Sequence, residues 1–384
     1  MAQHDKNLTV IPMEMREFGS FNDLEAAGID WNNVLSHSLD DNPFLTYEWL
    51  SEWWRSFGKG RKLQLLAVKE EDRVLLMIPL MISTYKAFGV KFRKLEFVAT
   101  PASDYHNFVM TDFEKNAEVT ELLRKKLRQN LGVNSMELTE IPEHSWTAKF
   151  LGDLNMDGNW KTTTRSLNLC PYINLPESMD KLLGNLGSNF RRNLKRWQKS
   201  AEKDYTIRFL KCNEIGSVEE GMKIFFELHQ KRWASKDKPG LFSNNQFRDF
   251  HMAVAKTFAQ KGWLSLFFLT FNGTPVSAIY GYEYNQKMYN YLTGFDPKYE
   301  AQRPGSLIFK NAIEYSISKG VTEFDFMRGG ESYKTSWGTI ARRNLEFRFL
   351  KKGFKSNVYS WITNSPRLMN LSKKIGGKME LDSR

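Results

Sequence analysis

Three residues at the start of a predicted helix have the types that bind an anion. Pro304, Gly305 and Ser306 follow a polar loop and begin an apolar-patterned segment that ends at Gly320. Proline suits the first helical position, because the N–H it lacks would have no partner there. Gly305 and Ser306 leave backbone N–H groups open at the positive end of the helix, which attracts phosphate. The alternative is an ordinary helix start in a strand–helix–strand crossover.

A carboxylate ends the predicted strand that follows this helix. Residues 322–326 alternate, so Phe324 and Phe326 share one face and Asp325 takes the other. We expect the phenylalanine face to be core and Asp325 to point towards a cleft. There it could act as general base or orient an acceptor. The alternative is an aspartate that caps the next turn.

Other polar side chains could move protons or bind charge. Tyr333 and Lys334, on a loop, could hydrogen-bond a developing oxyanion or bind an anion. Asp104, Tyr105 and His106 lie together where a strand gives way to a loop. His106 is the histidine we select for proton transfer, because its neighbours are polar. Structural hydrogen bonds are the alternative for all of these groups.

The elements that must position these residues alternate between strands and helices. The segment around Gly305 reads as strand (288–293), loop (294–303), helix (304–320) and strand (322–326). An earlier run of strands (63–68, 74–81 and 92–99) is followed by a helix (114–130) and a strand (135–140). This repeated order predicts an α/β (α+β) fold of two tandem halves, each a mixed, mostly antiparallel sheet flanked by helices. We place the junction at 171–176.

A basic amphipathic helix is predicted to begin the second half. Within residues 188–203, the apolar side chains fall on one side and the basic ones, among them Arg191 and Arg192, on the other. Such a helix suits an anionic membrane surface or the phosphates of a ligand. The third interpretation is a solvated face.

Composition limits the class of protein. The chain has 384 residues and a formal net charge of +11, and residues 341–384 hold 11 Lys and Arg against 3 Asp and Glu. The start lacks a signal-peptide pattern, and the apolar runs are shorter than the roughly 20 residues that span a bilayer. Cys170 and Cys212 form neither a disulfide framework nor a metal motif. We therefore expect a cytoplasmic protein without a metal, with contact to an anionic membrane left open through its basic tail.

Several motifs together resemble a known family, the GNAT-like acyltransferases of the CelD (cellulose biosynthesis) group, which are related to the Fem-type peptidoglycan transferases. The resemblance covers residues 170–345 and is weaker over residues 40–160. Its residues are Phe190-Arg191-Arg192-x-Leu194-x-Arg196, Leu228-His229-x-x-Arg232-Trp233, Gly294-Phe295-Asp296-Pro297-x-Tyr299, Pro304-Gly305-x-Leu307, Asp325-Phe326-x-x-Gly329 and Tyr333-Lys334-x-x-Trp337.

The resemblance implies roles for these residues and a division of the chain. It implies an N-terminal GNAT-like half (1–170), a GNAT-like acyltransferase domain (171–352) and a basic tail (353–384). Leu307 stands where the pyrophosphate motif of such folds has its second small residue. Together with the residue types, these motifs lead us to expect Asp325, His106, Tyr333 and Lys334 in catalysis, Gln302, Arg303, Gly305, Ser306 and Lys310 for the donor, and Asp104, Tyr105, Arg191, Arg192, Tyr299 and Arg328 for the substrate.

Three functions remain open at this point. The first is an N- or O-acyltransferase that moves an acyl group from acyl-CoA or acyl carrier protein to an amine or hydroxyl. The resemblance places its acceptor in exopolysaccharide, cell-envelope glycan or sugar metabolism. The second is a Fem-type transferase that uses aminoacyl-tRNA. The third is a non-catalytic module that binds a polysaccharide synthase or a membrane face.

Overall fold

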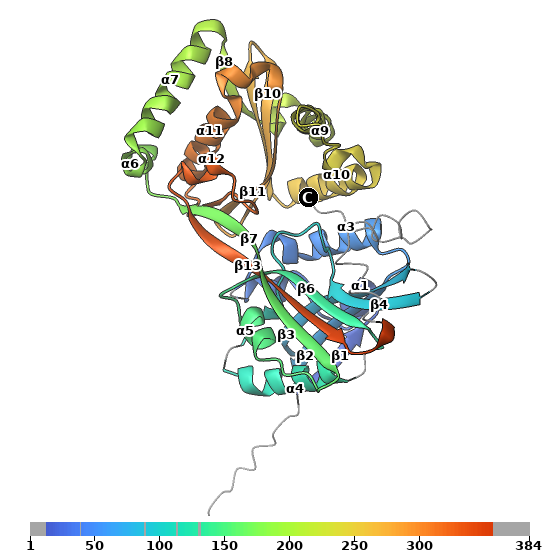
Figure 1. The fold of residues 1–384 in the computed structure, drawn as a ribbon. Helices are drawn as coiled ribbons and strands as arrows, with labels where there is room; N and C mark the ends of the chain where they lie inside the picture. Colours follow the sequence, from blue (N-terminus) through green and yellow to red (C-terminus); the bar gives the residue numbers. More distant parts are fainter. Residues whose placement is uncertain (1–12, 39, 88–89, 113, 130–131, 356–384) are drawn as a thin grey trace, which may run out of the picture.

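The chain folds into two lobes joined by two long strands (Figure 1). The structure is a computed structural model that describes residues 13–38, 40–87, 90–112, 114–129 and 132–355. The predicted basic tail, 353–384, lies outside the described residues from 356 onwards. No helix in the described part of the chain is long and apolar enough to cross a membrane.

The N-terminal lobe is a sheet with helices on both faces. Its apolar strand residues alternate between two cores, one under α4 and α5 and one against α3. Its elements are β1 (Glu14–Phe18), α1 (Phe21–Ala26), α2 (Trp31–Ser36), η1 (Pro43–Leu45), α3 (Tyr47–Phe57), β2 (Lys62–Glu70), β3 (Arg73–Ala87), β4 (Val90–Phe97), β5 (Val109–Met110), α4 (Asn116–Arg128), β6 (Ser135–Pro142) and α5 (Trp146–Gly152).

The C-terminal lobe repeats this arrangement. Helix α11 covers one face of its sheet, and α9 and α10 cover the other (Figure 1). Its elements are α6 (Met179–Asn185), α7 (Ser188–Asp204), β8 (Ile207–Lys211), α8 (Cys212–Ile215), α9 (Val218–Ala234), η2 (Leu241–Ser243), α10 (Asn245–Gln260), β9 (Leu264–Phe271), β10 (Thr274–Tyr284), β11 (Lys287–Phe295), η3 (Pro297–Gln302), α11 (Pro304–Ser318), β12 (Glu323–Asp325) and α12 (Ser332–Thr335).

Two strands belong to both lobes. Strand β7 (Trp160–Asn174) leaves the N-terminal lobe and pairs with β12, whereas β13 (Ile340–Lys351) returns and lies between β6 and β7. The strand order is β1-β2-β3-β4-β6-β13-β7-β12-β11-β10-β9-β8. The two predicted halves are therefore present, but their sheets form one hydrogen-bonded path. The predicted junction near 171–176 falls at the end of β7.

A shared aromatic core holds the lobes against each other. Trp49, on α3, is fully buried and packs edge-on against Phe44 from its own lobe and against Phe250 and Tyr282 from the other. Its indole N–H donates to the Ser103 hydroxyl at 2.9 Å. Trp49, on the buried face of α3, is thus an anchor between the lobes.

We expect Trp49→Ala to lower the free energy of unfolding by about 3–5 kcal/mol, because a buried indole leaves a cavity that neighbouring rings cannot fill. Denaturant unfolding, followed by circular dichroism, measures this. Trp54→Ala, on the same helix but only partly buried, is the control and should cost less. Equal losses of unfolding free energy in the two variants would contradict the assignment of Trp49 as an anchor between the lobes.

Candidate functional site

A cleft of 610 Å³ opens between the lobes, and both supply its walls. Its C-terminal-lobe residues come from α9, from β11 and from the segment after β12. Its N-terminal-lobe residues come from β4, β6, β13 and the loop after β4. Charged and aromatic side chains of the lining include Lys94, Glu96, Asp104, Glu137, Glu140, His229, Arg232, Trp233, Arg328, Tyr333, Lys334, Glu346 and Arg348.

Two parallel strands diverge at the edge of this cleft. Strand β12 pairs with β11 only where Glu323–Asp325 face Lys287–Tyr289. Strand β11 then continues to Phe295, and residues 290–293 line the cleft opposite Phe326 and Gly329. Backbone N–H and C=O groups that leave a ladder need other partners. A ligand that carries amides fits such an opening.

Helix α9 forms the wall beside β11. It approaches so closely that a Cβ on Gly294 would lie 2.5 Å from the backbone nitrogen of His229. The Trp233 indole N–H donates to His229 Nε2 at 2.9 Å, and Arg232 Nη1 donates to the carbonyl of Thr293 at 2.9 Å. These contacts fix the position of the helix on the strand.

Arg328 crosses from one lobe to the other at the floor of the cleft. Its Nε lies 2.7 Å from Asp104 Oδ1, and its Nη1 lies 2.8 Å from Glu140 Oε1. Asn344 donates to Glu140 Oε2 at 2.7 Å. Both carboxylates are buried. The sequence predicts Asp104 and Arg328 as substrate-binding residues, and the structure brings them together as an ion pair at the cleft.

Lys334 holds the loop that carries Arg328. The residue is 2% exposed, and its Nζ donates to the carbonyls of Met327, Arg328 and Gly329 at 2.8–3.1 Å and lies 2.9 Å from a Glu331 carboxylate oxygen. A lysine so engaged positions a loop. This differs from the predicted free lysine that binds an anion, because the carbonyls of a tight turn occupy its donors.

Tyr333, beside it, faces the cleft. Its ring stacks on Phe309 of α11 with the ring centroids 5.4 Å apart. Burial raises the pKa of the Tyr333 hydroxyl above its usual range. The group therefore stays protonated at neutral pH and can donate a hydrogen bond to an atom in the cleft.

The N-terminal lobe contributes a face of charged residues, which we call the charged face: Lys94, Glu96, Glu137, Glu346 and Arg348. They project from β4, β6 and β13 into the cleft, and all except Arg348 are less than 10% exposed. Lys94 Nζ lies 2.6 Å from Glu96 and 4.0 Å from Glu137. Arg348 lies 3.3 Å from Glu346 and 3.7 Å from Glu137.

The charged face holds three carboxylates and two cations. Burying charge is costly, so a cluster of this kind at a cleft is a candidate functional site. None of the residues of the charged face is among the site residues predicted from the sequence. The sequence pattern that could have identified the charged face is the alternation of charged with apolar residues in strands that are otherwise buried, as in Lys94-Leu95-Glu96-Phe97.

His106 does not reach the cleft. It is fully buried, stacks on Phe97 with centroids 4.9 Å apart, and its Nδ1 lies 3.0 Å from the carbonyl of Thr139. Burial lowers the pKa of His106 to about 4, so the ring is neutral at neutral pH. The structure thus places His106 in the core, whereas His229, a residue of the Leu228-His229-x-x-Arg232-Trp233 motif, lies at the cleft.

Asp325 is also buried, although its face is as predicted. Phe324 and Phe326 pack beneath α11, and the Asp325 carboxylate points the other way, with 0% of the residue exposed. The Tyr105 hydroxyl donates to it at 2.7 Å, and so does the backbone N–H of Met327. Burial raises the pKa of Asp325 to about 6. Tyr105 of the N-terminal lobe therefore covers Asp325 of the C-terminal lobe, and neither residue lines the cleft.

Part of the predicted anion site at α11 has the expected local shape, but the Ser306 N–H, predicted to be open, donates to the Arg303 carbonyl at 3.0 Å. Helix α11 begins at Pro304, as predicted, and Arg303 precedes it with a left-handed φ of 54°. A Cβ on Gly305 would meet nothing within 4 Å, so the helix start is open. Gln302 and Ser306 are partly buried beside it.

The remaining predicted residues lie elsewhere on the C-terminal lobe. Tyr299 packs edge-on against Tyr205 and Phe271, so its ring supports η3. Lys310 and Arg191 line a pocket between α7 and α11, whereas Arg192 is exposed on α7. These residues are not among those that line the cleft.

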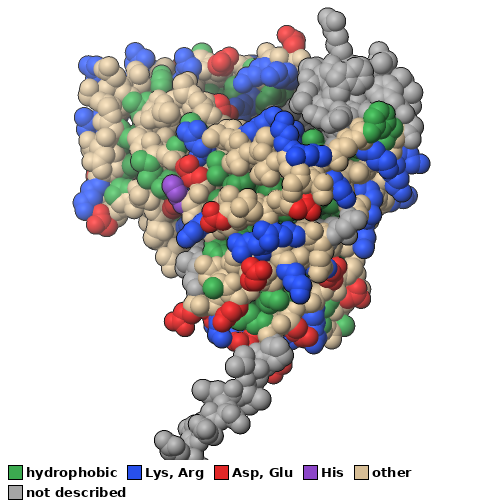
Figure 2. Space-filling view, turned by 60° about the horizontal axis from the view of Figure 1, so that its bottom comes forward, with side chains coloured by type: hydrophobic (Ala, Val, Ile, Leu, Met, Phe, Trp, Pro, Cys, Tyr) green, Lys and Arg blue, Asp and Glu red, His purple; other side chains and the backbone are tan. Residues whose placement is uncertain are grey.

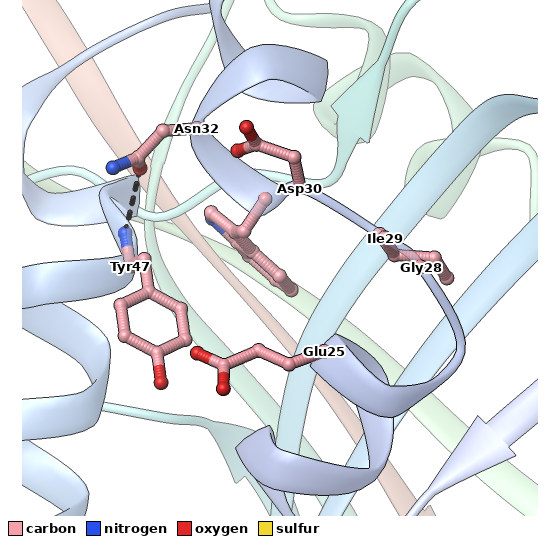
Figure 3. A pocket seen from close by; sticks show the side chains of 7 residues that line it. Glu25, Gly28, Ile29, Asp30, Asn32 and Tyr47 are labelled. Carbon is pink, nitrogen blue, oxygen red and sulfur yellow. Dashed lines mark hydrogen bonds between the residues drawn. The ribbon is translucent and has the colours of Figure 1, made fainter.

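Other surface features do not bring the predicted residues together. A pocket of 400 Å³ lies between α1, α2 and α3, where the Asn32 side chain accepts from the backbone N–H of Tyr47 at 2.9 Å (Figure 3). On the face drawn in Figure 2, Lys and Arg side chains are interspersed with Asp and Glu. Within the described residues, no group of three or more His, Cys, Asp or Glu is placed to hold a metal ion.

Comparisons with known proteins agree with this architecture. Residues 188–335 match the family model described as Acetyltransferase (GNAT) domain, which spans α7 to α12. A comparison with curated protein sequences gives no match.

Solved structures share the fold at low sequence identity. The crystal structure of FemX is 12% identical, with 90% of this chain and 99% of that chain covered and a TM-score of 0.63. The C-terminal DUF2156 domain of a protein from Agrobacterium fabrum is 8% identical over 92% and 99% of the two chains, with a TM-score of 0.49. A tandem GNAT protein from the clavulanic acid pathway is 10% identical over 89% and 99%, with a TM-score of 0.43. Because the last two scores are below 0.5, the likeness rests on FemX, and the protein has a FemX-like fold that contains a GNAT domain match.

Proposed function

We propose that the protein is an acyltransferase that moves an acyl group from a thioester donor to an amine or hydroxyl acceptor bound in the cleft. The observation that carries this proposal is the divergence of β11 and β12 directly beside the cleft. The opening offers backbone partners to an extended donor that carries amides, and the cleft leaves room for an acceptor opposite its reactive end.

The donor that these features suit is an acyl-CoA. Its pantetheine arm carries two amides for the opening between the strands. Its pyrophosphate suits the start of α11, where Gly305 leaves the backbone open and Gln302, Arg303 and Ser306 surround the helix end. The match of this region to the acetyltransferase domain supports the same donor.

The acceptor would lie over the charged face. Its nitrogen or oxygen attacks the thioester carbonyl carbon, the new C–N or C–O bond forms, and the C–S bond breaks. The acceptor proton leaves to a carboxylate or to water, and the thiolate takes up a proton. Carboxylates fixed on strands can orient a polar acceptor without reorganising during the reaction.

Within this scheme the cleft residues take different parts. Tyr333 would donate its proton, or a hydrogen bond, to the departing thiolate, because its hydroxyl is protonated and faces the cleft. Arg328 and Asp104 would contact the acceptor. Lys334 and Asp325 would act as positioning residues, since each is engaged with backbone groups of the loop after β12.

The physiological acceptor belongs, in this proposal, to exopolysaccharide or cell-envelope glycan synthesis, as the motifs of the CelD group suggest. A second candidate uses aminoacyl-tRNA as donor. The likeness to FemX over 90% of the chain supports it, together with Leu307 in the pyrophosphate motif. Both candidates use the same cleft and differ in the donor.

A direct experiment separates the two donors. The full-length protein is incubated with acetyl-CoA, with longer acyl-CoAs and with bulk aminoacyl-tRNA, and melting temperature is recorded. A ligand at 100 times its dissociation constant adds about 2.7 kcal/mol of apparent stability. We expect an acyl-CoA to raise the melting temperature and to release free thiol when amine or hydroxyl acceptors are added. A shift with aminoacyl-tRNA alone would favour the second candidate, and no shift with any donor would refute both.

Tyr333→Phe should lower turnover by about 100-fold or more, because proton transfer by a positioned group typically contributes at least that factor. Thiol release at saturating donor measures the effect. Tyr315→Phe, a partly buried tyrosine on α11 away from the cleft, is the matched control and should keep its rate. Equal rates in wild type and Tyr333→Phe would remove Tyr333 from the reaction.

Asp325→Asn should change stability in a pH-dependent way. The pKa of Asp325 is about 6 in the folded protein against a reference value of 3.8. Between these values the folded state keeps a proton that the unfolded state has lost, so rising pH lowers the carboxyl's contribution to the free energy of unfolding. Relative to wild type, the Asn variant should therefore gain stability as pH rises from about 4 to about 6.

Denaturant unfolding of both proteins at several pH values measures this difference. His106, with a pKa of about 4, titrates in an overlapping pH range. Its effect on stability is the same in both proteins and cancels in the comparison. If Asp325 is instead a general base, Asp325→Asn should lower turnover by at least about 100-fold. If Asp325 is a positioning residue, Asp325→Asn should lower turnover by less than this factor and should also show the pH-dependent change in stability.

A further inference from the structure

A second pocket lies on the far side of the C-terminal lobe from α9, between α6, α7 and α11. We call it the helical pocket. Its volume is 390 Å³, and none of its residues lines the cleft. In Figure 1, α7 runs alongside α11 at the edge of this lobe. The pocket is lined by Asp180, Leu183, Gly184, Arg191, Leu194, Lys195, Gln198 and Lys310.

The helical pocket has an excess of positive charge. Arg191 and Lys195 are one turn apart on α7 and so share a face, and Lys310 adds a third cation from α11. Asp180 is the single carboxylate of the lining, which leaves a net charge of +2. Lys310 Nζ lies 3.8 Å from Glu314, a loose pair. Within the described residues, Arg191 and Lys195 form no salt bridge with a carboxylate.

The walls of the helical pocket are fixed by packing along the first half of α7. Phe190 meets Trp337 edge-on with centroids 5.1 Å apart, and the Arg303 guanidinium lies 5.8 Å from the centroid of the Trp197 ring. Leu194, between them, is 2% exposed. The cations therefore project from a helix that is held in place, so the pocket is preorganised for a ligand.

The helical pocket is close to the start of α11. Lys310 follows Pro304 by six residues, which corresponds to about 9 Å along the helix axis. Arg303, at the helix start, contacts α7 through Trp197. A ligand whose one phosphate group lies at the helix start can therefore place another in the helical pocket.

We propose that the helical pocket binds the 3′-phosphate of coenzyme A. This proposal rests on the proposed function, because it takes the donor to be an acyl-CoA with its pyrophosphate at the start of α11. The 3′-phosphate is a monoester that is largely a dianion at neutral pH, which matches the net charge of the pocket. The ribose of coenzyme A carries the 3′-phosphate and the 5′ pyrophosphate on one ring. Both groups can therefore lie within the stretch of about 9 Å along α11 from Pro304 to Lys310.

Calorimetric titration of the full-length protein with coenzyme A and with 3′-dephospho-coenzyme A tests this proposal. We expect the phosphorylated form to bind at least about tenfold more tightly, since a hydrogen bond to a charged group contributes enough for such a factor. The preference should weaken at high salt, because the pocket is partly open to solvent.

Gly184 provides a matched pair of variants. It lies on α6 within the lining, and a Cβ there would meet nothing within 4 Å. Gly184→Glu adds a carboxylate to the pocket, whereas Gly184→Gln adds the same bulk without charge. Both residues favour helix more than glycine does, so folding should be kept. We expect Gly184→Glu to abolish the preference for the 3′-phosphate and Gly184→Gln to retain most of it.

Cation removal gives an independent comparison. Arg191→Gln should reduce the preference by several-fold, while Arg196→Gln, an exposed arginine that helical geometry turns about 140° away from Arg191 on α7, should leave it unchanged. Melting temperatures of all variants confirm that each is folded.

The results of these experiments distinguish a failure of the helical-pocket proposal from a failure of the proposed acyltransferase function. Equal binding of the two coenzymes would overturn the helical pocket as the phosphate site and leave the acyl-CoA donor standing. Absence of binding of either coenzyme, with no thiol release from acyl-CoA, would refute the proposed function itself. Loss of aminoacyl-tRNA binding in Gly184→Glu, with no effect on coenzyme A, would assign the pocket to an RNA phosphate and overturn the proposal.

Discussion

The pairing of Arg328 with Asp104 and Glu140 sets the geometry of the cleft. A guanidinium from the C-terminal lobe is held by two buried carboxylates of the N-terminal lobe. Removing one partner of a buried pair typically costs about 3–5 kcal/mol, because the other charge is left without compensation. The loop that bears Arg328 must therefore stay where those carboxylates are. Lys334 holds its carbonyls there, and Tyr333 follows from the same loop into the cleft.

Charge is distributed unequally between the charged face and the helical pocket. The chain as a whole carries a formal net charge of +11, yet the charged face of the N-terminal lobe has one more carboxylate than cations. The helical pocket on the other lobe has the opposite excess. A donor rich in phosphate and an acceptor with positive or neutral polar groups would thus be attracted to different places. Long-range attraction of this kind raises association rates and orients ligands before contact.

Local signals in the sequence predict much of the C-terminal lobe. Apolar periodicity and the Pro304-Gly305 start predict α11, and alternation predicts β11 and β12, because each signal depends on neighbouring residues. The positions of Asp325 and His106 depend instead on distant partners. Tyr105 covers Asp325 across 220 residues of sequence, and a local pattern holds no information about such a contact. The charged face was within reach of sequence reasoning, through alternating charge in buried strands, but its members join only when β13 returns to β6.

The crossing of β7 and β13 has a consequence for dividing the chain in the laboratory. A fragment that begins at the predicted boundary, residue 171, would retain β13 but lose most of the strand that pairs with it. The complementary fragment would keep β7 and lose β13, which separates β7 from β6 in the intact sheet. Each piece would present a long unpaired strand edge, and such edges recruit other chains. Coexpression of the two fragments is therefore the route by which either half should remain in solution.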